Sequence, residues 1–303
     1  MVYKKSILIA ILALPAAGAS GEDYTWNGTG TAWNNQAHWN SDEGGYPDDE
    51  SDTATIPFVE SRVYPNLTTT LTIKALTLGN NGANEGAVLT LTANLTVAGK
   101  NAVSVAEFAH VDLGDDRLVL TGGGLIVLDG WIEDGAVDFL GGHTYETTGS
   151  GGFLGADFVM ELTPSGFPSA ETLVLGSGNW IRGSAIVRVA LVNNGLVDPN
   201  DNVSVGTEVN DTITLTCAPK IGYGNWSVTC DDCDEPGEMN TLIINAPVVG
   251  TGNLTVGHHG FLDVNRLMSL LGDFDQSGAY SRVSIAAETV FDVDRFSCIA
   301  CPE

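Results

Sequence analysis

The fold of this chain is decided by residues 71–124, which read LTIKALTLGNNGANEGAVLTLTANLTVAGKNAVSVAEFAHVDLGDDRLVLTGGG. Apolar and polar residues alternate over short runs, and Gly, Asn or Asp ends each run. Alternation with a period of two is typical of a half-buried β-strand, and the abundant Thr and Val suit such a strand. The stretch predicts a succession of short strands without an amphipathic helix between them.

The same pattern extends over most of the chain. Between residues 67 and 142 the predicted strands are LTIKALTLG, AVLTLTANLTVAG, VSVAEFAHVDLG, DRLVLTGGG and GAVDFLGG. Beyond Gly149 they resume as ETLVLGSGNW, SAIVRVALVNNG, VSVGTEVNDTITLTC, NWSVTC, NTLIINAPVVG and NLTVGHHGFLDV. Short strands bounded by turn residues predict an all-β protein.

The turns recur at a nearly constant interval. Gly79, Gly99, Gly122 and Gly142 end successive blocks at spacings of 20, 23 and 20 residues. Blocks of that size are typical of stacked repeats, in which glycine supplies positive φ angles at the corners. We therefore predict a parallel β-helix, or β-solenoid. A β-sandwich with a strand every eight to twelve residues or so is the alternative.

The N-terminus has the features of a secretory signal peptide. Lys4 and Lys5 precede an apolar run over residues 7–14, and the small residues 17–19 resemble a cleavage site. A retained anchor is the alternative, but the run is shorter than the roughly 20 residues that span a bilayer. We predict a signal peptide at 1–19, no membrane span in the mature chain, and a secreted, extracellular or cell-surface location.

The charge is strongly negative. The 303 residues include 38 acidic and 12 basic side chains, for a net charge of −26. Such a field repels phosphates, so we expect no nucleic-acid partner. It attracts cations, and the two interpretations are solubility in a salt-rich exterior and dedicated calcium sites.

All five cysteines lie in the last third of the chain: Cys217, Cys230, Cys233, Cys298 and Cys301. In an exported protein the first expectation is disulfides, with one thiol left over. The two C-x-x-C pairs are also compatible with a structural zinc or iron site, or with redox chemistry. The segment at about 199–238, with its acidic cluster CDDCDEPGE, is interpreted as an excursion held by cysteine.

Residues 24–57 read YTWNGTGTAWNNQAHWNSDEGGYPDDESDTATIP. The series Trp26, Trp33, Trp39, Pro47 and Asp52 is followed by LTLG at 76–79 and LTV at 95–97. Over residues 22–125 this resembles exported bacterial β-helical surface proteins, namely autotransporter-like passengers and surface proteins of planctomycetes and verrucomicrobia. The resemblance implies a secreted or surface-displayed solenoid with a structural or adhesive role and no shared catalytic residues.

The three tryptophans have two interpretations. The first coil of a solenoid exposes apolar surface and backbone that would promote aggregation, and large indole rings can cover it. Indole faces also bind the apolar faces of sugars. We divide the chain into the signal peptide, a Trp-rich N-terminal cap at 20–66 and a β-solenoid at 67–303.

One segment resembles a calcium loop. Asp273, Asp275 and Ser277 occupy positions one, three and five, and Gly278 occupies position six. Position twelve is Ser284, where a bidentate acid belongs. Calcium is therefore the one possible cofactor, and an acidic turn between strands is the alternative.

No catalytic residue is predicted. Arg182 and Arg188 fall on or near one predicted strand, and the sequence offers neither an acid–base partner. We expect a non-catalytic structural or adhesive component of a cell surface, extracellular matrix or filament. Its expected partner is a further copy, joined by strand addition, or an extracellular glycan. The alternative is a polysaccharide-active β-helix enzyme, either a lyase or a glycoside hydrolase.

Overall fold

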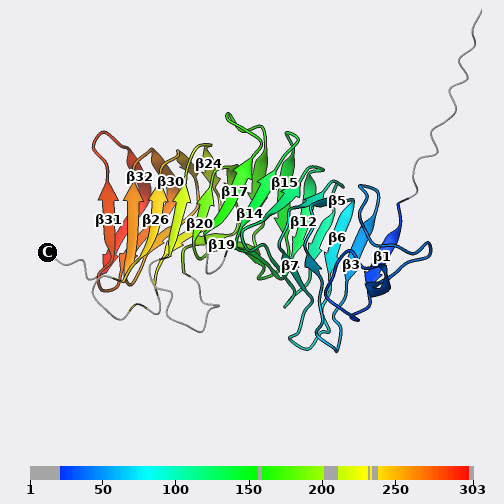
Figure 1. Ribbon diagram of the computed structural model, residues 1–303. Coiled ribbons are helices and arrows are strands. Elements are labelled where there is room, and N and C mark those ends of the chain that lie inside the picture. The colour runs from blue at the N-terminus through cyan, green and yellow to red at the C-terminus, as the bar shows by residue number, and fades with distance from the viewer. Residues whose placement is uncertain (1–20, 156–158, 201–210, 231–232, 234–237, 300–303) are drawn as a thin grey trace, which may run out of the picture.

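The computed structural model describes residues 21–155, 159–200, 211–230, 233 and 238–299. The predicted signal peptide lies outside these ranges. The described chain is almost entirely β-structure, and its one helical turn is the 3-10 helix η1 (Gln36–His38). None of its helices has the length and apolar character needed to cross a membrane. The strands form an elongated stack that runs from β1 at one end to β31 and β32 at the other (Figure 1).

The strands make three parallel ladders, because from β3 to β27 each strand pairs with the third strand after it. For example, β9 pairs with β12, β10 with β13, and β11 with β14. The first ladder contains β1 (Asp23–Trp26), β3 (Thr53–Ile56), β6 (Ala75–Leu78), β9 (Val103–Val105), β12 (Gly124–Leu128), β15 (Thr144–Thr148), β18 (Thr172–Leu175), β21 (Ala190–Asn193), β24 (Lys220–Gly222) and β27 (Val248–Gly250).

The second ladder contains β4 (Asn66–Leu67), β7 (Val88–Leu91), β10 (His110–Asp112), β13 (Trp131–Glu133), β16 (Phe153–Leu154), β19 (Trp180–Arg182), β22 (Leu196–Asp198), β25 (Asn225–Val228) and β28 (Leu254–Val256). The long strands β30 (Met268–Ser277) and β32 (Phe291–Ile299) continue both ladders at once. Together with β2 (Trp39–Asn40), these strands form one 22-stranded sheet.

The third ladder is a separate 10-stranded sheet. It contains β5 (Leu71–Ile73), β8 (Leu95–Val97), β11 (Arg117–Leu120), β14 (Ala136–Phe139), β17 (Met160–Pro164), β20 (Ala185–Val187), β23 (Thr212–Leu215), β26 (Asn240–Ile244), β29 (Gly260–Val264) and β31 (Arg282–Ile285). Among these strands only the β1–β2 pair is antiparallel. The fold is therefore all-β and solenoid-like, and the β-sandwich alternative, which requires antiparallel sheets, is wrong.

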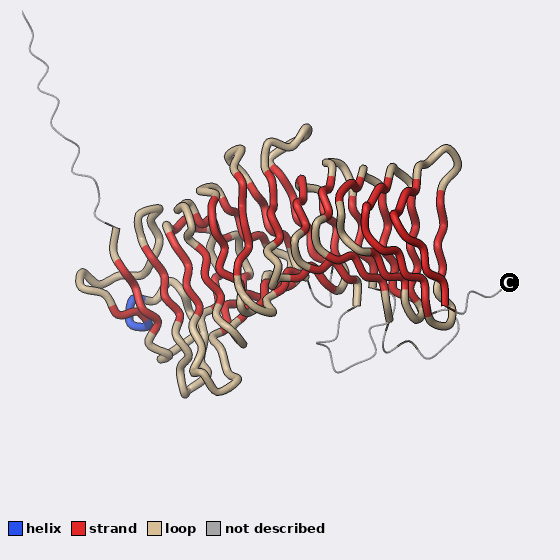
Figure 2. The backbone as a smooth tube through the Cα atoms, turned by 180° about the vertical axis from the view of Figure 1, so that it is seen from behind, coloured by secondary structure: helices blue, strands red, loops and turns tan. Residues whose placement is uncertain are grey.

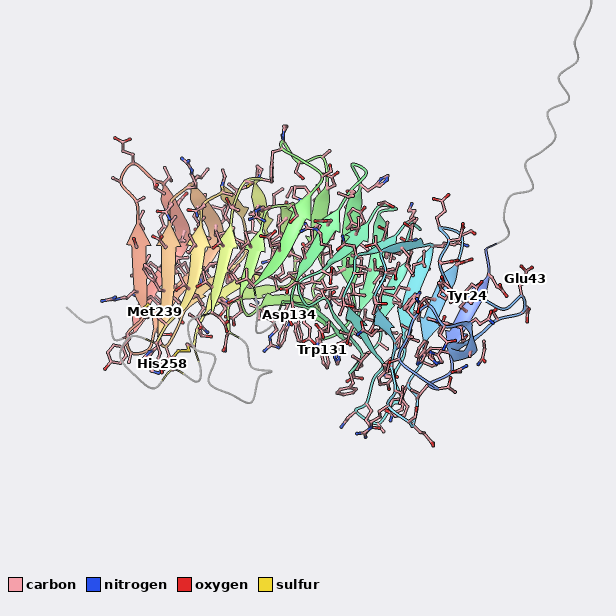
Figure 3. All side chains as sticks on the ribbon, in the orientation of Figure 1. Tyr24, Glu43, Trp131, Asp134, Met239 and His258 are labelled. Carbon is pink, nitrogen blue, oxygen red and sulfur yellow. A yellow bond between two sulfur atoms is a disulfide. The ribbon has the colours of Figure 1, made fainter. Side chains whose placement is uncertain are left out.

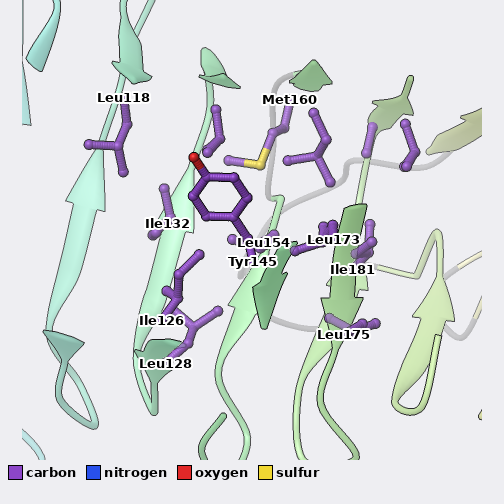
Figure 4. Packing of buried hydrophobic residues seen from close by; sticks show 14 of the residues in the cluster. Leu118, Ile126, Leu128, Ile132, Tyr145, Leu154, Met160, Leu173, Leu175 and Ile181 are labelled. Atoms are coloured by element: carbon purple, nitrogen blue, oxygen red, sulfur yellow. The ribbon is translucent and has the colours of Figure 1, made fainter. Parts of the chain in front are cut away.

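The core runs along the inside of the stack. In β8, for instance, Leu95 and Val97 are buried while Thr96 between them is half-buried. Figure 4 shows how side chains from successive strands pack on one another around Tyr145. The Tyr145 hydroxyl lies 2.6 Å from the carbonyl oxygen of Leu120 and 2.7 Å from that of Leu140. Burial of a Leu, Val or Ile side chain contributes roughly 1.5–3 kcal/mol, so the repeated rungs build up most of the stability.

Several runs predicted as one strand are two strands joined by a corner. LTIKALTLG contains β5 and β6, with only Lys74 between them. AVLTLTANLTVAG contains β7 and β8, and VSVAEFAHVDLG contains β9 and β10. Apolar and polar residues continue to alternate through the corner, because side chains that face the core before the bend are followed by side chains that face the core after it. The sequence pattern therefore does not reveal the corner. Loops extend from the corners of the stack, as Figure 2 shows.

The four periodic glycines do not all play the predicted part. Gly99 and Gly122 occupy the same corner on neighbouring rungs, whereas Gly79 follows β6 at another corner. Only Gly142 has a positive φ, of 69°. Gly122 is needed for a different reason, because a Cβ atom there would collide with the carbonyl oxygen of Gly99.

The N-terminal end of the stack is closed by aromatic side chains. Trp26, Trp33 and Trp39 are buried, and their rings meet edge to face with centroids 4.8 to 5.0 Å apart. Each indole N–H donates to a main-chain carbonyl oxygen, at 2.9 Å for Trp26, 2.9 Å for Trp33 and 2.7 Å for Trp39. Strand β2 pairs antiparallel with β1 across Trp26 and Trp39.

Candidate functional site

Several aromatic side chains lie together on the outer face of the second ladder. His110, Trp131, Phe153 and Trp180 begin strands β10, β13, β16 and β19, and parallel pairing places them in one register position. The next residue of each strand points into the core. Because neighbouring strands lie about 4.8 Å apart, in-register aromatic residues form a column along the stack. We call these four residues the aromatic column.

Three rings of the column stack face to face. The His110 and Trp131 ring centroids are 4.9 Å apart with 5° between the ring planes, and the Trp131 and Phe153 centroids are 5.7 Å apart with 1° between the planes. The Arg182 guanidinium lies 5.0 Å from the Phe153 ring centroid and 4.9 Å from that of Trp180. Both faces of Trp131, and one face each of His110 and Trp180, are therefore covered by a neighbouring ring or by the guanidinium, which favours rigidity over sugar stacking.

A buried arginine and a half-buried aspartate continue the same face. Arg182 is 5% exposed, and Asp198 lies beside it in the pairing of β19 with β22. Burial raises the pKa of Asp198 to about 6, although the backbone N–H of Asn200, at 3.1 Å, and the Arg182 charge act against this rise. The pair places a carboxyl group that titrates near neutrality next to a fixed cation.

His110 ends the column with a neutral ring. Burial lowers its pKa, and the negative charge of Asp112 opposes that effect only in part. Its Nε2 atom lies 3.6 Å from a carboxylate oxygen of Glu133, the third residue of the next strand. Because the imidazole is neutral at pH 7, its interaction with Glu133 is weak. His110 therefore contributes mainly as a stacked ring.

An acidic hollow lies beside the column. An open cavity of about 830 Å³ is lined by Asp112, Asp115, Asp134 and Glu161, with Arg117 among them. Arg117 donates from Nε and from one Nη to the two carboxylate oxygens of Asp138. Figure 3 labels Trp131 and Asp134 together near the middle of the stack. Within the described ranges, no group of three or more His, Cys, Asp or Glu side chains is arranged to hold a metal ion.

The structure places the predicted tryptophan site inside the protein. Trp26 and Trp33 are 1% exposed and Trp39 is 5% exposed, so none offers an indole face to a sugar ring. The predicted interpretation as sugar-stacking residues therefore lacks an accessible surface.

The proposed calcium loop is a strand. Asp273, Asp275 and Ser277 all belong to β30, and alternate residues of a strand spread along one face and do not converge on one point. Their side chains have other partners: Asp273 lies 3.6 Å from Arg295, and Asp275 accepts a hydrogen bond from Ser297 at 2.8 Å. Neither the calcium loop nor the acidic turn describes this backbone.

The cysteines divide as follows. Cys230 and Cys233 form a disulfide with a Cα–Cα distance of 5.4 Å, and both are buried. Cys217 is a free, exposed thiol. The side chain of Cys298 and all of Cys301 lie outside the described residues. Because the first C-x-x-C pair is bonded within itself, it does not supply thiolates to a four-sulfur metal site.

The arginines have acidic partners that the sequence does not reveal. Arg188 lies 2.7 Å from Glu161, which is distant along the chain, and Arg182 has Asp198 beside it. The two arginines also lie on different ladders, since Arg182 ends β19 and Arg188 follows β20.

Sequence reasoning also missed the aromatic column. Its signal is a recurring tetrapeptide, AHVD at 109–112, GWIE at 130–133, GFLG at 152–155 and NWIR at 179–182. Each has a residue that allows a tight corner, then a ring, then an aliphatic core residue. The unequal spacing of these tetrapeptides conceals the repeat until the register of the rungs is known.

The chain matches no protein-family model, no curated protein and no solved structure. The resemblance of residues 22–125 to exported bacterial β-helical surface proteins therefore stays a prediction.

Proposed function

We propose that this chain is an exported structural or adhesive component of a cell surface, extracellular matrix or filament, built as a parallel β-helix with a Trp-rich N-terminal cap. The observation that carries the proposal is the aromatic column, whose ring faces are used to join one rung to the next. Side chains that contact each other from rung to rung stiffen the rod. The rest of its repetitive outer surface is then free to contact other molecules.

The three-ladder pairing supports the β-helix. From β3 to β27 each strand pairs with the third strand after it, so the chain passes through all three ladders in each turn, as a helical coil would. The buried tryptophans at the first rung support the cap, because they cover the end of the core with apolar rings whose N–H groups are all satisfied.

A rod with these features suits an extracellular role. The net charge of −26 keeps such a surface soluble and favours cation-rich surroundings. A disulfide between Cys230 and Cys233 fits an oxidising compartment. The partners proposed for the surface are another copy of this chain or an extracellular glycan.

Asp198 favours the second candidate, a polysaccharide-active enzyme. A carboxyl group with a pKa of about 6 is suited to act as a general acid. The aromatic column would then border a substrate groove. The two candidates differ in whether Asp198 is required for turnover of a glycan.

Two experiments separate the candidates. Immunogold electron microscopy of the producing cells, with antibodies against the mature chain, is expected to label the exterior, surface or matrix; label confined to the cytoplasm would overturn the proposal. The purified protein and its Asp198→Asn variant are then assayed on neutral and acidic polysaccharides. We expect no turnover by either protein. Turnover by the wild type that is lost in the variant would establish the enzyme instead.

A further inference from the structure

The last rung that the structure describes differs from the first. We call β31 and β32 the terminal rung. Its inward residues continue columns that are buried one rung earlier, so that each lies over a core residue: Val283 over Leu262, Ile285 over Val264, Phe291 over Met268, Val293 over Leu270 and Phe296 over Phe274. The underlying residues are at most 2% exposed, whereas Ile285 is 47% and Phe296 is 61% exposed. Within the described residues, the last rung therefore presents apolar side chains to solvent.

The main chain of the terminal rung is also open. β31 pairs only with β29, and β32 only with β30, so within the described residues the outer edges of both strands have no ladder partner. Figure 1 shows β31 and β32 as the last strands of the stack. Unpaired strand edges next to apolar side chains favour pairing with another extended backbone.

A second copy meets an obstructed first ladder if it continues the stack head to tail. The edge of β1 is already occupied by β2 at Thr25 and Trp26, and the core behind it is covered by the buried tryptophans, whereas β5 in the third ladder pairs only with β8. A head-to-tail contact would therefore leave the first-ladder part of β32 without a strand partner, and β32 of another copy can provide one.

Strand β32 is complementary to itself when two copies run antiparallel. Residues 291–296 read FDVDRF, and a two-fold axis between Val293 and Asp294 places Phe291 opposite Phe296 and Asp292 opposite Arg295. The same axis places Val293 opposite Asp294, where the register between β30 and β32 shifts, and the two phenylalanines that flank this point face the same way. Phe291 and Phe296 both contact the buried ring of Phe274, with centroids 5.3 and 5.1 Å away.

The charged residues lie on the outer side. Asp292 accepts a hydrogen bond from Ser269 at 3.4 Å, and the Arg295 side chain lies 3.6 Å from Asp273. The same axis therefore brings apolar side chains together on the inside and opposite charges together on the outside.

We propose that two copies of this chain associate through their terminal rungs, tail to tail, about a two-fold axis perpendicular to the stack. Apolar burial supplies the affinity, and the Asp292–Arg295 pairs fix the register. The product is a rod of twice the length with a Trp-rich end at each extremity. This inference does not depend on the proposed function, since an enzyme could form the same dimer.

Sedimentation equilibrium of the full chain, expressed with its own N-terminal segment, tests the proposal. We expect a monomer–dimer equilibrium, and small-angle scattering should give the dimer about twice the maximum dimension of the monomer. Arg295→Asp and Asp292→Arg each oppose like charges and should weaken the dimer by about tenfold or more, which corresponds to ~1.4 kcal/mol. The double charge swap restores opposite charges and should recover the wild-type affinity.

The matched control is Arg266→Asp, which makes the same charge change at an exposed position before the terminal rung and should leave the affinity unchanged. Circular dichroism establishes that each variant is folded. A wild type that stays monomeric at all concentrations would overturn the proposal, as would a charge swap that fails to recover dimerisation. Filaments with a single-chain repeat, or a dimer with the length of a monomer, would also overturn it.

Discussion

Lys220 shows how one side chain can satisfy buried polar groups that the rest of the core leaves without partners. It is fully buried, and its ammonium donates to the carbonyl oxygens of Val189, Thr216 and Ala218 at 2.8, 3.1 and 2.7 Å. Three donors meet three acceptors, which is the full capacity of the group. Burial nevertheless lowers the pKa of Lys220 to about 7, because the charged form has left water.

The lowered pKa of Lys220 predicts a pH dependence of stability. A lysine whose pKa falls on folding stabilises the protein most above its ordinary value of 10.5, and that contribution is lost as the pH falls toward about 7. Chemical denaturation between pH 7 and 10 should show this decline in the wild type. Lys220→Met removes the titrating group, so the decline should be absent from the variant. Parallel curves for the two proteins would contradict the prediction.

Asp198 predicts a pH dependence in a lower range. Its pKa rises on folding to about 6, so its contribution to stability is present below about pH 4 and lost as the pH rises through 6. Asp198→Asn keeps an oxygen for the Asn200 N–H and does not ionise. The free energy of unfolding of the variant, relative to the wild type, should increase between pH 4 and 6 by on the order of 2 kcal/mol. A difference that is constant with pH would refute the assignment.

At the scale of elements, the corners limit how closely the rungs can stack. Gly224, Gly252 and Gly272 follow one another at the turn between the first and second ladders. A Cβ atom on each would collide with the carbonyl oxygen of the glycine before it in the column, which for Gly224 is Gly195. The distance between neighbouring strands in a ladder leaves no room for a methyl group where the backbones of two successive rungs meet at a corner.

The corner column predicts a contrast between two glycine substitutions. Gly224→Ala should lower the free energy of unfolding by about 1–3 kcal/mol, because the backbone must move to admit the methyl group. Gly166 has open space around its Cβ position and no positive φ. Gly166→Ala should therefore be neutral or stabilising by about 0.4–1 kcal/mol. Both variants are compared with the wild type by thermal and chemical denaturation. If the two substitutions changed stability equally, the close approach of backbones at the corner would not be the reason for glycine there.

At the scale of the whole molecule, the two ends of the described stack differ in how much of the core they expose. The tryptophans bury the N-terminal side of the core, whereas the terminal rung exposes the C-terminal side. In a stack where each rung contacts mainly its neighbours, the ends are the least protected parts. The cap and the dimer contact would each protect one end.

The protection of the N-terminal end by its tryptophans can be tested by removing one of them. Trp33→Ala removes a buried ring and the hydrogen bond to the carbonyl oxygen of Pro47, and should destabilise the protein by about 3–5 kcal/mol. Trp131, which is half-buried on the outer face, provides the comparison. Trp131→Ala should cost less, and it should not increase hydrogen exchange in β1 and β3. Faster exchange at β1 and β3 in Trp33→Ala alone is the expected result.

The sequence by itself determined the all-β class and the repeated short strands, because alternation depends only on which residues face the core and is read locally. It also located the strands around Leu95 and Leu118 and the closing role of glycine near Gly122. The tertiary structure alone decided the register. Corners of variable length shift each rung along the chain, so the distance in sequence from Trp131 to Phe153 differs from that between Phe153 and Trp180 although each pair is in contact. The aromatic column, the Arg182–Asp198 pair and the complementarity of the terminal rung depend on that register, since side chains meet only after the coils have stacked.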